Sequence, residues 1–241
     1  MKKLFVPALA VLCLQSAYAA EYTVNKITNN YPPFTEPAVM ANGDVAWYSF
    51  DGSDLEVYVY RAQSKTLSQL TNNSVADSVG ASNSHGDVLV FSQVGAPGDR
   101  VNSPQLSLYS GSDGTAHILG AGVVNADINE RGDVVWSSYD GNDLEIFLCQ
   151  SSTGTTTQLT DNSTDDLLTS WYQYLNLHAI DNNGNVTWIG NDGDKEIFLY
   201  TASTGTITQL TDNTLDDTNP TIGNGNVVWS GFDGTDTELF L

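Results

Sequence analysis

Short apolar runs follow one another along most of the chain, and Gly, Asn, Asp, Ser or Thr residues bound each run. Runs such as residues 134–136 and 197–200 are rich in β-branched and aromatic residues, which favour strands. The second run is apolar at every position, as expected of a strand that is covered on both faces. No segment keeps a sustained helical period. The pattern therefore predicts an all-β chain of short antiparallel strands joined by tight turns.

One unit of this pattern, a Gly turn followed by a strand that contains Trp, recurs along the sequence. The copies start at residues 42, 85, 131, 183 and 224, so they are 43, 46, 52 and 41 residues apart. These intervals match the ~40–50-residue period of four-stranded propeller blades. The copies cover residues 42–47, 85–91, 131–136, 183–188 and 224–229, and the second of them is degenerate because it lacks the Trp.

Each interval carries the same further segments in the same order. An acidic turn follows the Gly-turn strand, and then come a strand led by Glu, a Ser/Thr/Gly turn, a strand that ends in Gln-Leu-Thr and an Asp/Asn-rich loop. Each strand type occurs five times when residues 23–28 are included as a Thr-ended strand. We expect residues 20–241 to form one all-β domain, a five-bladed β-propeller of four-stranded antiparallel blades. The N-terminal strand at 23–28 is expected to complete the last blade, which begins near Pro220, and so to close the ring without a free edge.

Two stretches of the repeat carry a family resemblance. Trp136 leads through an acidic turn to residues 145–148, and residues 209–213 lead through Asp217 to Pro220. In these stretches the chain resembles the TolB-like and WD40-like propeller repeats of secreted bacterial proteins. The resemblance implies the propeller fold and a role as a binding platform, but it does not select a ligand.

Residues 1–19 have the pattern of a secretory signal peptide. Lys2 and Lys3 supply a positive start, residues 4–14 form a short apolar run, and residues 17–19 fit a small-residue cleavage site. We therefore expect export to the periplasm or the extracellular space. Cys149 is then the one cysteine of the mature chain, so no intrachain disulfide is expected.

The charge balance of the chain disfavours some classes of binding partner. The sequence of 241 residues has 29 acidic and 8 basic residues, a formal net charge of −21. Nucleic acids and anionic membranes need clustered Lys and Arg, so neither is expected as a partner. In a propeller, the acidic turns and the Asp/Asn-rich loops would emerge on one face. These acids are Asp51, Asp54, Asp77, Asp140, Asp143, Asp161, Asp165, Asp166, Asp192, Asp194, Asp212, Asp216, Asp217, Asp233 and Asp236.

The acidic turns have two possible roles. Aspartates spaced as in Asp140 with Asp143 and Asp233 with Asp236 suit the coordination of a hard cation, so these four residues are the candidate ligands for calcium. The same residues are also ordinary hairpin residues that accept hydrogen bonds from their own backbone. The sequence leaves both roles open.

An irregular segment offers the asymmetric site that a specific ligand needs. The long interval between residues 131 and 183 contains Trp171, Tyr172, Tyr174 and His178. Aromatic side chains beside carboxylates could stack against a sugar or a peptide, and they could equally cover an edge of the core. We therefore name these four residues as the candidate ligand-binding site.

No motif of a known catalytic class is present. The sequence contains no Gly-x-Ser-x-Gly elbow, no His-Glu-x-x-His motif and no phosphate-binding loop. We expect a non-enzymatic, monomeric binding scaffold that engages a protein or carbohydrate ligand through its acidic face. The alternative is a carbohydrate-active hydrolase or a lectin-like sugar binder on the same face, because paired carboxylates for glycoside hydrolysis could occur there.

Overall fold

The computed structural model describes residues 24, 26–28, 37–95, 104–169 and 178–241. These residues contain eighteen strands and no helix, so the described part of the chain has no helix that could span a membrane. The strands are β1 (Ala38–Val39), β2 (Val45–Phe50), β3 (Leu55–Arg61), β4 (Thr66–Gln69), β5 (Asp77–Ser82), β6 (Val88–Ser92), β7 (Gln105–Tyr109), β8 (Ala116–Ala121), β9 (Val123–Ile128), β10 (Val134–Tyr139), β11 (Leu144–Gln150), β12 (Thr155–Gln158), β13 (Val186–Asn191), β14 (Lys195–Thr201), β15 (Thr206–Gln209), β16 (Thr218–Gly223), β17 (Asn226–Phe232) and β18 (Thr237–Phe240).

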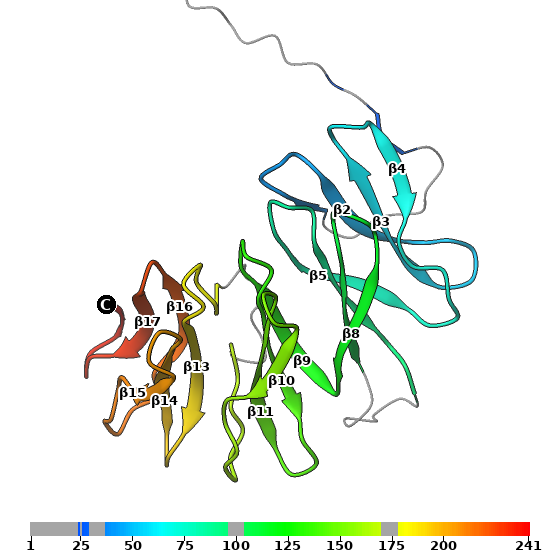
Figure 1. Ribbon diagram of the computed structural model, residues 1–241. Helices are drawn as coiled ribbons and strands as arrows, with labels where there is room; N and C mark the ends of the chain where they lie inside the picture. The colour runs from blue at the N-terminus through cyan, green and yellow to red at the C-terminus, as the bar shows by residue number, and fades with distance from the viewer. Residues whose placement is uncertain (1–23, 25, 29–36, 96–103, 170–177) are drawn as a thin grey trace, which may run out of the picture.

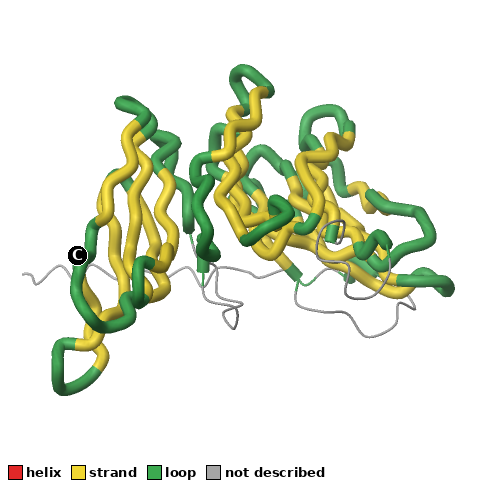
Figure 2. Tube along the Cα trace, turned by 90° about the horizontal axis from the view of Figure 1, so that it is seen from below, coloured by secondary structure: helices red, strands yellow, loops and turns green. Residues whose placement is uncertain are grey.

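The strands form five antiparallel sheets that follow one another in chain order along an arc (Figure 1). Blade 1 contains β1–β4, blade 2 β5–β8, blade 3 β9–β12, blade 4 β13–β15 and blade 5 β16–β18, and in each blade neighbours in sequence are neighbours in the sheet. The five Gly-turn strands are β2, β6, β10, β13 and β17. The predicted all-β architecture of five antiparallel units is therefore confirmed. Figure 2 shows the loops gathered at the two ends of the strands.

In the described part of the chain, two separate bridges stand in the place of the first strand of blade 4. Leu167 pairs with Ile189, and Ile180 pairs with Val186, each as an isolated antiparallel bridge. Both partners lie in β13, so these bridges occupy the place that a complete first strand has in blades 2 and 3. In the sequence, all four residues of the predicted aromatic site lie between these two bridges.

The predicted closing strand remains a prediction. Of residues 23–28, the structure describes Val24, Lys26, Ile27 and Thr28, and none of these four lies in a strand. Val24 is 95% exposed. Among the described strands, β18 pairs with β17 alone.

The apolar core lies between neighbouring blades. One cluster joins Val135 and Ile146 of blade 3 to Leu168, Val186 and Trp188 of blade 4, and similar clusters join the other consecutive blades. Burial from both sides explains why these strands are apolar on both faces.

The repeated Trp stacks on an aromatic residue of the next strand. In four blades the ring centroids are 5.7–6.0 Å apart and the rings are nearly parallel. The pairs are Trp47–Tyr58, Trp136–Phe147, Trp188–Phe198 and Trp229–Phe240. In blade 2 the corresponding cross-strand pair is Val90 and Ser107, so the degenerate copy of the repeat has no ring stack at this position.

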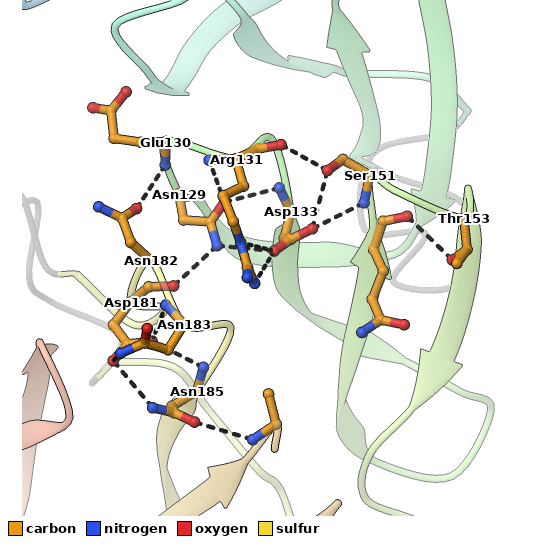
Figure 3. A network of polar contacts seen from close by, with 12 residues as sticks. Asn129, Glu130, Arg131, Asp133, Ser151, Thr153, Asp181, Asn182, Asn183 and Asn185 are labelled. Carbon is orange, nitrogen blue, oxygen red and sulfur yellow. Dashed lines mark hydrogen bonds and ion pairs between the residues drawn. The ribbon is translucent and has the colours of Figure 1, made fainter.

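Asparagine side chains connect the blades at the end where the Gly turns lie. The side-chain amide of Asn83 donates to the Asn129 carbonyl (3.2 Å), and that of Asn129 donates to the Asp181 carbonyl (2.9 Å). The carboxylate of Asp181 in turn accepts from the Gly225 amide (2.9 Å). Figure 3 shows the part of this ladder that joins blades 3 and 4. The Gly-turn ends of blades 2 to 5 are thus held together by polar groups that are satisfied internally.

Candidate functional site

The acidic turns and loops emerge together at the ends of the strands opposite the Gly turns. This follows from strand order: β2, β10, β13 and β17 each run into an acidic turn, and β4, β12 and β15 run in parallel with them into the Asp/Asn-rich loops. We call this surface the acidic face. Among the described residues of these turns and loops and of the strand ends beside them, Lys195 is the one basic residue, and it forms an ion pair with Asp216 (3.2 Å).

In three of the acidic turns, one oxygen of the first Asp has a hairpin role, and in blade 4 Asn191 takes this role. Asp51 Oδ1 accepts from the Ser53 amide, and Asp140 Oδ1 accepts from the Asn142 amide, both at 2.8 Å. Asp233 Oδ1 accepts from the Thr235 amide at the same distance. The hairpin role is therefore present, and it uses one of the two carboxylate oxygens.

In blades 1, 3 and 4 the copied Glu is buried and bound to the loop that follows the last strand of its own blade, whereas Glu238 of blade 5 is exposed. In blade 3, Glu145 Oε1 accepts from the Asn162 amide (2.7 Å), and the Asn162 side chain donates to Asp166 (2.6 Å). Thr160 completes the connection by accepting from the Ile146 amide (2.9 Å). The same set recurs as Glu56, Thr71, Asn73 and Asp77 in blade 1 and as Glu196, Thr211, Asn213 and Asp217 in blade 4.

This network was readable in the sequence but was not recognised there. Thr, Asn and Asp follow the Glu by 15, 17 and 21 residues in each of the three blades. In blade 2, Gln105 replaces the Glu. The role of the Glu–Thr–Asn–Asp network is to fix the Asp/Asn-rich loop against the acidic turn of the same blade.

In blades 1 and 4 two acids of the turn come together with the buried Glu, and in blade 3 one acid of the turn and one of the following loop do so. One carboxylate oxygen from each member lies within 4.8 Å of the others. The groups are Asp51, Asp54 and Glu56; Asp140, Glu145 and Asp161; and Asp192, Asp194 and Glu196.

The four predicted calcium ligands are separated by the structure into two pairs. Asp140 belongs to the blade 3 group, and Asp143 is buried beside it. Asp233 and Asp236 are exposed, and neither belongs to a group of three acids among the described residues. Blades 3 and 5 therefore differ although their turn sequences are alike.

The predicted aromatic site is described only in part. Trp171, Tyr172 and Tyr174 lie outside the described residues. His178 is described and exposed, and its carbonyl accepts from the Ile222 amide of blade 5 (2.8 Å). His178 therefore lies where blade 4 meets blade 5, and its role in ligand binding stays a prediction.

A pH dependence of stability follows from the buried network of blade 3. Burial raises the pKa of Asp166 to about 7, although the Asn162 amide lowers it, and the charge of Glu145 raises it further. The folded protein therefore holds a proton that the unfolded chain, with an Asp pKa of about 3.9, releases. Stability from this group is complete below about pH 4 and is lost as the pH rises through about 7. We expect the Tm, measured in a chelating buffer, to fall between pH 5 and pH 8.

Asp166→Asn is the matched variant for this prediction. An Asn cannot ionise and can still accept from Asn162, so its Tm should fall less than that of the wild type over the same pH range. A wild-type Tm that rises toward pH 8, or an equal fall in both proteins, would contradict the assignment.

Comparison with known proteins agrees with the fold and leaves the function open. No family model and no curated protein sequence matches the chain. Among solved structures, puromycin hydrolase is similar over 86% of this chain and 35% of its own, with a TM-score of 0.61 and 14% identity. A TolB-type protein from Agrobacterium tumefaciens is similar over 89% of this chain and 77% of its own, with a TM-score of 0.53 and 13% identity.

A third similar structure is the β-propeller domain of the Trilobed protease from Pyrococcus furiosus. It is similar over 86% of this chain and 65% of its own, with a TM-score of 0.53 and 11% identity. The fold is thus a TolB-like β-propeller, as the repeats predicted. The chain spans about a third of the length of puromycin hydrolase.

Proposed function

We propose that this protein is an exported, non-enzymatic binding scaffold that engages a positively charged protein partner through its acidic face. One observation carries the proposal: the acidic turns and loops of successive blades gather on one face, with Lys195 as their one basic neighbour among the described residues. Propellers commonly serve as binding platforms, and the similarity to TolB-type and peptidase propellers supports this general role. Residues 1–19 support export.

The opposite end of the strands is electrostatically different. There Arg61 pairs with Asp44 (3.0 Å), and Arg131 pairs with Asp133 (2.6 Å). Hydrogen bonds from the Ala62 amide and Arg61 lower the pKa of Asp44 although burial opposes them, so this acid stays charged and paired. The acidic face has few such counter-charges, so its field would attract a basic partner and speed association at low ionic strength.

The test is binding of a lysine-rich peptide to the protein in a chelating buffer of low ionic strength. We expect saturable binding that weakens as salt is added. Asp212 and Asp236 are exposed acids of the acidic face. The double variant Asp212→Asn/Asp236→Asn should bind about fivefold more weakly, which corresponds to about 1 kcal/mol.

A charge-matched variant gives the control. Ser152→Lys/Ser203→Lys changes the net charge by the same amount, but both residues are exposed in the Ser/Thr/Gly turns at the other end of the strands. Its affinity should stay close to that of the wild type. Equal weakening in the two double variants would show that only the net charge matters and would overturn the role of the acidic face.

A further inference from the structure

The acidic turn of blade 3 contains a buried carboxylate without a partner. Asp143 is 8% exposed, and neither of its carboxylate oxygens has a hydrogen-bond partner among the described residues. A buried carboxylate in this position is costly unless it gains a proton or a cation.

Glu145 points to the same place from the neighbouring strand. It is fully buried, and while Oε1 accepts from Asn162, Oε2 has no hydrogen-bond partner among the described residues. One of its carboxylate oxygens lies within 4.8 Å of oxygens from Asp140 and Asp161. The turn, the strand and the following loop thus bring Asp140, Glu145 and Asp161 together, Asp143 lies buried in the same turn, and the two buried acids have unused oxygens.

We propose that blade 3 binds a calcium ion between its acidic turn and the loop after β12, with Asp140, Asp143, Glu145 and Asp161 as the ligands. The donors are all carboxylate oxygens, which hard cations prefer, and no His or Cys belongs to the group. Ca²⁺ tolerates irregular geometry, whereas Mg²⁺ demands a nearly ideal octahedron and retains water. The site does not depend on the peptide partner proposed above, because the ion alone satisfies the buried acids.

The other blades have weaker versions of the site. In blade 4, Lys195 forms an ion pair with Asp216, whereas in blade 3 Leu144 occupies the position of Lys195, so the corresponding Asp165 meets no basic side chain there. In blade 1, Asn72 and Ala76 occupy the positions of Asp161 and Asp165. Ligand charge tunes calcium affinity, so blade 3 should hold the tightest site.

The experiment is calorimetric titration of CaCl₂ into the chelator-stripped full chain, together with thermal melting with and without Ca²⁺. We expect saturable binding with one dominant site and a higher Tm in Ca²⁺, because the ion binds the folded state. Mg²⁺ at equal concentration should raise the Tm less. Absence of saturable binding, or an equal effect of Mg²⁺, would overturn the proposal.

Two variants locate the site. Asp140→Asn and Asp233→Asn remove the same charge from the same turn position, and Asn can still accept the turn hydrogen bond that Asp140 and Asp233 each accept. Asp140→Asn should weaken Ca²⁺ binding about tenfold or more, whereas Asp233→Asn should leave the tightest site unchanged. Equal weakening by both would indicate general charge attraction and would overturn the site.

Asp143→Asn gives a readout that a purely structural role would not produce. It removes an unpartnered buried charge, so the metal-free variant should melt no lower than the wild type. Its Tm should then no longer rise in Ca²⁺. A metal-free Asp143→Asn protein that melts lower and still responds fully to Ca²⁺ would show that Asp143 supports the turn and binds no ion.

Discussion

Replacement of Trp188 by Ala is expected to lower the free energy of unfolding by about 3–5 kcal/mol. Trp188 is 1% exposed and packs in the cluster that joins blades 3 and 4. Its ring also stacks on Phe198 with the centroids 5.8 Å apart. Removal of the indole would leave a cavity between two blades as well as an unpaired aromatic ring, and a core built from inter-blade contacts cannot easily collapse to fill it.

Trp229→Ala is the internal control, because Trp229 occupies the same position in blade 5. It stacks on Phe240 in the same way, but it is only partly buried. Its replacement should therefore cost clearly less. Urea unfolding measures the loss of stability in both variants, provided that the slope of the unfolding free energy against denaturant concentration stays constant. Equal losses in the two variants would contradict the view that burial between blades, rather than stacking within a blade, sets the contribution of this residue.

The sequence contained enough information for the blades because each blade repeats a local rule. The Gly of the recurring turn adopts a positive φ, as in Gly132 (82°) and Gly184 (83°), which other residues rarely adopt. The strand that follows this Gly then pairs with the next strand in the same register in each case: Trp136 lies opposite Phe147, and Trp188 lies opposite Phe198. Turn chemistry and strand pairing act over short distances, so a periodic sequence predicts both.

The candidate site depends on contacts that a local pattern does not contain. Asp140 and Asp233 look the same in sequence, and both cap their own turns. They differ because in blade 3 the following loop places Asp161 beside the buried Glu145, whereas Glu238, the corresponding residue of β18 in blade 5, is exposed. The Gly-turn ladder from Asn83 to Asp181 was missed for the same reason, since each of its bonds joins residues of different blades.

Asp127→Ala is expected to lower the free energy of unfolding by about 2–4 kcal/mol. Asp127 lies in β9 of blade 3 and is 7% exposed. Its carboxylate accepts from the Ile128 amide (2.8 Å) and from the Ala179 amide of blade 4 (2.8 Å). Burial raises the pKa of Asp127 although these amides lower it, so the loss of a buried acid offsets part of the cost of leaving the amides unpaired.

The position of these contacts explains the size of the expected effect. Among the described residues, two bridges to β13, at Leu167 and Ile180, stand in the place of the first strand of blade 4, and the bond from Ala179 to Asp127 ties this segment to blade 3. The adjacent His178 carbonyl accepts from Ile222 of blade 5, so this short segment links three blades. Hydrogen exchange should therefore show faster exchange at Ala179 and at Ile222 in Asp127→Ala, in addition to the lower stability measured by urea unfolding.

Asp236→Ala, at an exposed position, should change stability by less than about 0.5 kcal/mol. If Asp127→Ala were as stable as Asp236→Ala, the buried carboxylate would not be what holds the Ala179 segment of blade 4 to blade 3.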